Sequence, residues 1–200
     1  MDRLPRKLPA FALLLFLLGS TTAEAHSDLR LGPFAGGILH PFETPAHLLI
    51  LIALGLLLGR RAPFRLWPLL GLFAPVAAAA MLVTLADHAA PVPAWITTAL
   101  ALALGVVLAA GWSTSRALDY ALLAFSALVI GLDSGFASTS ALLVAKVLFG
   151  NWVCFLVLIG YLAFYTALLP PRPWIRTAFR IAGSWIVAIS LLLLLTWRRP

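Results

Sequence analysis

Long apolar segments alternate with short polar ones along most of the chain. Six apolar blocks cover roughly residues 34–59, 66–86, 92–111, 117–132, 140–169 and 178–197. Each can form a membrane-spanning helix, because a helix satisfies its own backbone polar groups without water. The fourth block is short for a span, whereas the fifth has room for tilt or for an extension outside the bilayer. The pattern predicts an all-α, polytopic bundle of six transmembrane helices that forms a single domain over residues 26–200.

The first 25 residues have the organisation of a secretory signal peptide. Its three parts are a basic start, an apolar run and an A-x-A cleavage site, at Arg3, Arg6 and Lys7, at residues 8–18 and at Ala23-Glu24-Ala25. The apolar run is shorter than the ~20 residues of a span, which favours cleavage over an uncleaved anchor. Cleavage would make His26 the N-terminus. Its free amine and imidazole could then bind a metal together, although a solvated first residue is the alternative.

Positive charge recurs in alternate loops between the blocks. If the mature N-terminus lies outside, the first, third and fifth loops lie inside, and they hold Arg60, Arg61, Arg65, Arg116, Arg172, Arg176 and Arg180. The second and fourth loops contain no Lys or Arg. This distribution follows the positive-inside rule, with the terminal Arg198-Arg199 as the exception. We therefore expect a bacterial inner-membrane protein with both mature termini in the periplasm.

Composition supports a lipid environment and excludes several classes of protein. Of the 200 residues, 62% are hydrophobic and 10% charged, whereas a soluble domain has about 25% charged residues. The formal net charge of +7 does not indicate nucleic-acid binding, because the arginines lie in short runs between apolar blocks. The single Cys154 excludes an intrachain disulfide and a CxxC motif. Since GxSxG, HExxH and Walker-type motifs are missing, we expect no enzymatic activity.

Histidines and acids collect on the predicted outer side of the membrane, above all at His40, Glu43 and His47. On a continuous helix, their i, i+3, i+7 spacing would place them on one face. Imidazole and carboxylate suit divalent Ni, Co, Cu or Zn. However, Thr44-Pro45 is typical of an N-cap followed by proline at the first helical position. It predicts a helix break, with a separate short or re-entrant piece before it, and transporters use such breaks for binding sites.

The predicted metal site therefore comprises His26, His40, Glu43 and His47, as a cap over the outer mouth of the bundle. The alternative is that these histidines are interfacial side chains bonded to backbone or water. A possible secondary polar site comprises Asp87, His88, Asp133 and Lys146. For these residues the alternatives are a polar turn at Asp87-His88, an ion pair of Lys146 with Asp133 or Asp87, and a lysine that extends to the interface.

The sequence Gly37-Ile38-Leu39-His40-Pro41, followed by His47-Leu48-Leu49, resembles the first-helix motif of the HupE/UreJ family of hydrogenase and urease accessory membrane proteins. Ala25-His26 also matches the Ala-His that follows the family's signal peptide. The chain departs from the pattern at Thr44 and Ala46, where the family has glycine and aspartate, and it lacks the later histidine-rich segments. The resemblance implies six helices and uptake of nickel or a related metal without ATP hydrolysis.

Three functions remain open from the sequence. The first is a permease or accessory protein for a divalent transition metal, with Ni²⁺ or Co²⁺ ahead of Cu²⁺ or Zn²⁺ as the transported or sensed ion and no permanently bound cofactor. The second is a non-transporting accessory protein that acts through a protein partner, such as a metalloenzyme maturation protein. The third is a haem-binding membrane protein. Haem is the weakest, because axial histidines normally come from facing helices, and all four histidines here lie toward one side.

Overall fold

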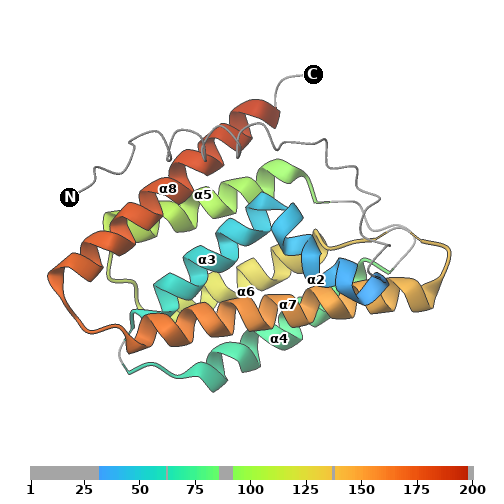
Figure 1. Ribbon diagram of the computed structural model, residues 1–200, viewed down its shortest axis with the longest axis horizontal. Coiled ribbons are helices and arrows are strands. Elements are labelled where there is room, and N and C mark those ends of the chain that lie inside the picture. The colour runs from blue at the N-terminus through green and yellow to red at the C-terminus, as the bar shows by residue number, and fades with distance from the viewer. Residues whose placement is uncertain (1–31, 62, 86–91, 137, 198–200) are drawn as a thin grey trace, which may run out of the picture.

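The structure is a computed structural model that describes residues 32–61, 63–85, 92–136 and 138–197. Within these residues the regular secondary structure is entirely helical (Figure 1). The helices are α2 (Pro33–Glu43), α3 (Pro45–Gly59), α4 (Leu66–Val83), α5 (Ala94–Ala110), α6 (Arg116–Leu132), α7 (Ala141–Leu168) and α8 (Pro173–Trp197).

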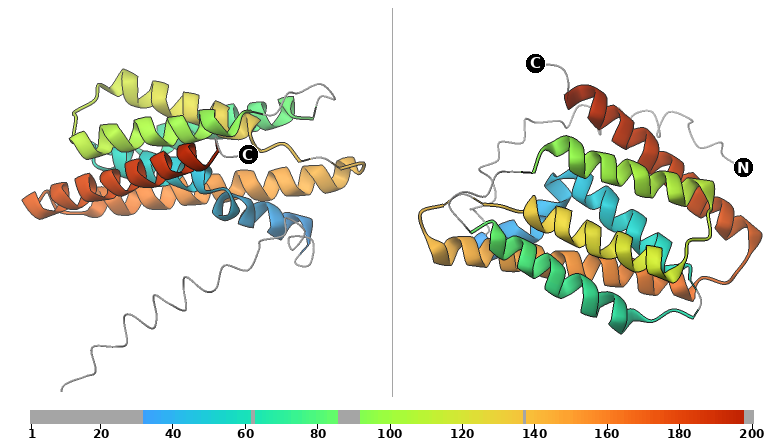
Figure 2. Two further views of the ribbon diagram at one scale, coloured as in Figure 1. Left: turned by 90° about the horizontal axis from the view of Figure 1, so that it is seen from above. Right: turned by 180° about the vertical axis from the view of Figure 1, so that it is seen from behind.

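Helix α3 is the centre of the bundle, and it contacts α2, α5, α6, α7 and α8. Around it, α5 packs along α8, α4 packs along α6, and α7 lies against α2, α3 and α4 (Figures 1 and 2). The apolar composition of α3 explains its position, because side chains such as Ile50, Leu51 and Leu54 are completely buried. A helix that is apolar all round is buried on every side.

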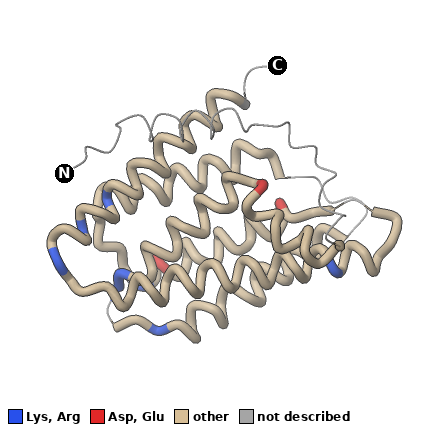
Figure 3. Tube along the Cα trace, in the orientation of Figure 1, with Lys and Arg blue, Asp and Glu red and all other residues tan. Residues whose placement is uncertain are grey.

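From α3 to α8, successive helices run in opposite directions, so the bundle has two ends (Figures 1 and 2). We call one the histidine end; it contains the α2–α3 junction and the residue that follows α6, with His40, His47 and Asp133. We call the other the arginine end; it contains the ends of α3 and α5 and the starts of α6 and α8. Arginines gather there, around the turn where α7 leads into α8 (Figure 3). This separation matches the charge asymmetry that the sequence predicts.

All six predicted apolar blocks contain helix, the first as the pair α2 and α3. Three helices, α4, α7 and α8, are long and apolar enough to cross a membrane, and the bent pair α2–α3 becomes a fourth if it is one broken span. Helix α5 is apolar but shorter. The described part of the chain is thus all-helical with three or four candidate membrane spans, while the full set of six spans stays a prediction. The predicted signal peptide, residues 1–25, lies outside the described residues.

The start of the last helix differs from the sequence prediction. Helix α8 begins at Pro173 rather than near residue 178, so Arg176 and Arg180 belong to its first turns and not to a loop. Proline is well suited to the first helical position. Ile175 is buried there against the bundle, which stabilises the additional turn despite the flanking arginines.

The predicted break at Thr44-Pro45 is confirmed. Helices α2 and α3 meet at an angle of 76°, and Thr44 between them has extended backbone (φ −105°, ψ 91°). The cause is local, because a residue that precedes proline is disfavoured in the helical region. Thr44 holds the N-cap position of α3, but its side chain forms no capping hydrogen bond.

Two glycines fix α2 against α7. A Cβ atom on Gly37 would lie 2.0 Å from the Val147 carbonyl oxygen, and one on Gly150 would lie 2.2 Å from the Phe34 carbonyl oxygen. The two backbones therefore touch where neither helix has a side chain, as small residues allow in helices packed within lipid. This contact sets the position of α2, and hence of His40, relative to α3.

Candidate metal site at the histidine end

His47 lies in the first turn of α3 and is completely buried (0% exposed). Its Nε2 lies 2.8 Å from Oδ2 of Asp133, which directly follows α6. A neutral imidazole that donates Nε2–H to this carboxylate has its lone pair on Nδ1. That Nδ1 atom is buried and forms no hydrogen bond within the described residues. Metal-binding histidines have this arrangement, in which a carboxylate on one ring nitrogen fixes the tautomer and leaves the other nitrogen for the ion.

His40 lies in the last turn of α2, on the other side of the break. Its ring is 5.5 Å from the His47 ring, centroid to centroid, at an interplanar angle of 66°. The ring of Phe155, from α7, lies 5.8 Å from the His47 ring at 83°. The bend between α2 and α3 therefore brings two imidazoles together beside an apolar wall.

The other predicted site residues are less closely associated with this pair. Glu43 is exposed at the end of α2, and Lys146 is exposed on α7. Asp133 forms its ion pair with His47 rather than with Lys146. His26, Asp87 and His88 lie outside the described residues. Within the part of the chain that the structure describes, no three His, Cys, Asp or Glu side chains are placed to hold one metal ion.

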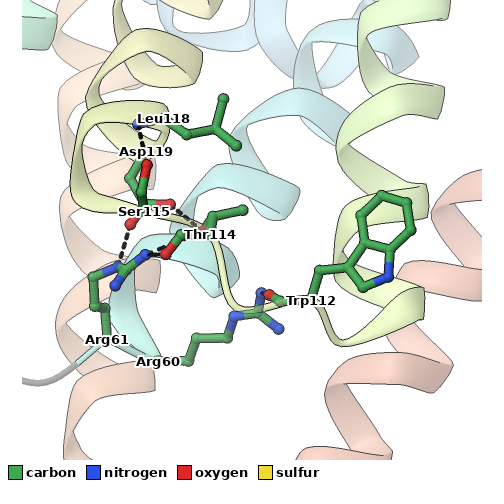
Figure 4. Close-up of polar contacts among 7 residues, drawn as sticks. All are labelled: Arg60, Arg61, Trp112, Thr114, Ser115, Leu118 and Asp119. Carbon is green, nitrogen blue, oxygen red and sulfur yellow. Dashed lines mark hydrogen bonds and ion pairs between the residues drawn. The ribbon is translucent and has the colours of Figure 1, made fainter.

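A second buried polar cluster, at the arginine end, was not predicted from the sequence. Arg61 forms an ion pair with Asp119 and donates a hydrogen bond to the Thr114 carbonyl oxygen, and the Thr114 hydroxyl donates to Asp119 (Figure 4). Asp119 is 3% exposed. The Ser115 side chain accepts a hydrogen bond from the Leu118 amide (3.2 Å) and so caps the start of α6. One signal pointed to this cluster: Asp119 is the one acid among the arginines of the predicted inner side.

Arg60 lies next to this cluster and donates a hydrogen bond to the carbonyl oxygen of Trp112 (Figure 4). Burial lowers the pKa of the Arg60 guanidinium below its ordinary value, and the Asp119 carboxylate acts in the opposite direction. An arginine starts from so high a pKa that the group stays protonated at neutral pH. The arginine end therefore keeps its positive charge.

Comparison with known proteins identifies the family. A family model described as HupE / UreJ protein matches residues 13–193. No curated protein and no solved structure matches the chain. The family match covers well over half of the chain, and it confirms the resemblance to this family. The chain therefore belongs to the HupE/UreJ family, a nickel- and cobalt-related family of hydrogenase and urease accessory membrane proteins.

Proposed function

We propose that this chain is an inner-membrane permease for a divalent transition metal, Ni²⁺ or Co²⁺, and that it binds the ion at the histidine end, facing the periplasm. One observation carries the proposal: a buried His47 is oriented by Asp133 through Nε2 and lies beside His40. The family supplies the class of metal, and the geometry supplies the candidate ligands.

The chemistry of the pair favours a transition metal over Mg²⁺ or Ca²⁺. Neutral imidazole nitrogen is a good ligand for Ni, Co, Cu and Zn, whereas the alkaline-earth ions prefer oxygen. Nitrogen ligands lie about 2.0–2.1 Å from such an ion, and rings 5.5 Å apart between centroids are near enough to bind the same ion through one nitrogen each. In this arrangement Asp133 is the orienting partner of His47 and not a ligand.

The position of the pair also suits transport. His40 and His47 belong to different halves of a broken apolar helix, so a change in the angle between α2 and α3 would change the distance between the two imidazoles. Broken helices at membrane depth form ion sites in transporters. His26 and Glu43 are proposed as further ligands at the outer mouth, with Asp87 and His88 as polar groups close to the path.

Cellular uptake of Ni²⁺ and Co²⁺ tests this proposal. We expect the His40→Ala/His47→Ala double variant to abolish the uptake that depends on this protein, because the ion loses both imidazoles. Thr139→Ala is a suitable control, since Thr139 is exposed in the loop between α6 and α7. The amount of each variant in the membrane fraction is measured in parallel.

Two results distinguish the alternatives. Unchanged uptake by the double variant at equal abundance would refute the permease site. Metal binding by the purified protein without any uptake in cells would instead assign the non-transporting accessory role.

A further inference from the structure

Two neighbouring cavities open at the arginine end, between the end of α5 and the start of α8. They have volumes of about 360 and 370 Å³, and Arg60, Gly111 and Arg176 line both. Arg180 lines the larger one. Hydroxyl groups accompany the guanidinium groups, from Ser113 and Thr114 in one cavity and from Thr177 in the other.

Four arginines line these cavities. Arg61 is paired with Asp119, whereas Arg60, Arg176 and Arg180 form no ion pair with a carboxylate of the described residues. The described acids are Glu43, Asp119 and Asp133, and two of them lie at the histidine end. The third, Asp119, is already paired with Arg61. None of the described residues that line the two cavities is an Asp or Glu. An anion is therefore the complementary ligand.

Contacts with the backbone hold two of the arginines in place. Arg60 donates to the Trp112 carbonyl oxygen, and Arg180 Nε donates to the Ala109 carbonyl oxygen at 3.0 Å. Gly111 connects these two points with a left-handed backbone (φ 69°). Each guanidinium has five N–H donors, so each keeps donors for a ligand. Arg176 is exposed, and no hydrogen bond to another described residue occupies its side chain.

The surroundings distinguish a lipid headgroup from a free ion. Trp112 lines one cavity, Trp174 follows Pro173 of the other, and both indoles are exposed. Tryptophan is typical of the membrane interface. The outer faces of the adjoining helices are apolar, with Val106 on α5 and Ile181 and Trp185 on α8 exposed. A phosphate group in the cavities would thus lie at the level of headgroups, with acyl chains along α5 and α8. Basic pockets between membrane helices bind anionic phospholipids in this way.

We infer that Arg60, Arg176 and Arg180 form a binding site for the phosphate of an anionic phospholipid headgroup, between α5 and α8. The inference does not depend on metal transport, because the site lies at the opposite end of the bundle from His40 and His47. Its consequence is that anionic lipid fastens the peripheral helix α8 to α5.

The test measures phosphatidylglycerol binding to the purified full chain in detergent, by native mass spectrometry and by lipid-dependent thermal stabilisation. Phosphatidylcholine and inorganic phosphate serve as the comparison ligands. We expect Arg176→Gln/Arg180→Gln to weaken phosphatidylglycerol binding by about tenfold or more, since each arginine contributes to headgroup affinity. The control is Arg65→Gln/Arg172→Gln, which removes the same charge from the same end but lines neither cavity.

A second variant distinguishes loss of the lipid site from misfolding of the protein. Arg176→Gln alone removes no hydrogen bond to the described chain, so it should reduce phosphatidylglycerol binding while the lipid-free unfolding temperature is unchanged. Equal losses in the two double variants would overturn the site in favour of a general effect of charge. Inorganic phosphate that binds as tightly as phosphatidylglycerol would overturn the assignment to lipid.

Discussion

The two ends of the bundle each contain a carboxylate paired with a nitrogen base, but in one pair the carboxylate is the buried partner and in the other the base is. Asp119 is 3% exposed, whereas the Asp133 side chain is 20% exposed and its partner His47 is completely buried. At the arginine end, Asp119 is paired with Arg61, and Thr114 bonds to both side chains. At the histidine end, Asp133 is bonded to His47, whose Nδ1 remains without a hydrogen-bond partner within the described residues. The comparison teaches that a carboxylate paired with a nitrogen base inside the bundle does not by itself identify a binding site. In the first pair both Asp119 oxygens are engaged, by Arg61 and by Thr114, so the pair fastens helices together. In the second pair the His47 Nδ1 lone pair is left available, so this pair can bind a metal ion.

The largest expected effect is a loss of stability when a bulky side chain pushes α2, which holds His40, away from α7. Gly150→Leu inserts a side chain where a Cβ alone would lie 2.2 Å from the Phe34 carbonyl oxygen, so α2 must move away from α7. We expect a loss of about 4 kcal/mol or more in unfolding free energy, because the obstructing atom belongs to the helix backbone and cannot move aside by a change of side-chain rotamer. Thermal unfolding in detergent measures it. The control is Gly71→Leu, since a Cβ at Gly71 has no neighbour within 4 Å. Equal stability of the two variants would contradict this packing.

The second prediction concerns the ion pair between Arg61 and Asp119 at the arginine end. Arg61→Gln leaves the buried Asp119 carboxylate without its partner, which should cost about 3 kcal/mol of stability. Arg65→Gln, at an exposed position of the same end, should cost far less. Metal affinity of the folded Arg61→Gln protein should be that of the wild type. If Arg61→Gln reduced metal affinity without reducing stability, the division of roles between the two ends would be wrong.

The third prediction concerns Asp133 and His47 at the histidine end. Asp133→Asn keeps the shape of the side chain but removes the charge that orients His47 and favours its Nε2–H tautomer. We expect metal affinity to fall by about 10–100-fold, as for other partners of metal-binding histidines. Equilibrium dialysis with Ni²⁺ measures it. Asp119→Asn should show the reverse pattern, with lower stability and unchanged affinity. Equal metal affinity in the wild type and Asp133→Asn would eliminate the orienting role.

The smallest effect is expected at Lys146, which the sequence placed in a secondary polar site. Because this lysine is exposed and Asp133 is engaged with His47, Lys146→Gln should leave the rate of metal uptake within about twofold of the wild type, as for an exposed charge with little interaction energy. Uptake is measured at equal protein abundance. A large increase in rate would show that Lys146 repels the cation and gates its path.

The sequence predicts what local chemistry determines. Apolar blocks predict the helices, and Pro45 predicts the break, because proline acts on the residue directly before it. The pairing of His47 with Asp133 could not be predicted, since the residues are 86 positions apart and meet only when α6 ends beside the start of α3. Arg61 and Asp119 meet for the same reason. The arginines before residue 178 favour a loop in the sequence, but α8 starts earlier, at Pro173, because Ile175 between them is buried.

The central claim is that the histidine end binds the metal and the arginine end does not. Ni²⁺ binding to the purified full chain, measured by equilibrium dialysis, tests it most directly with two variants. We predict that His40→Ala/His47→Ala eliminates specific binding and that Arg176→Gln/Arg180→Gln leaves the dissociation constant unchanged. Wild-type affinity in the histidine double variant, with the protein folded, would contradict the account.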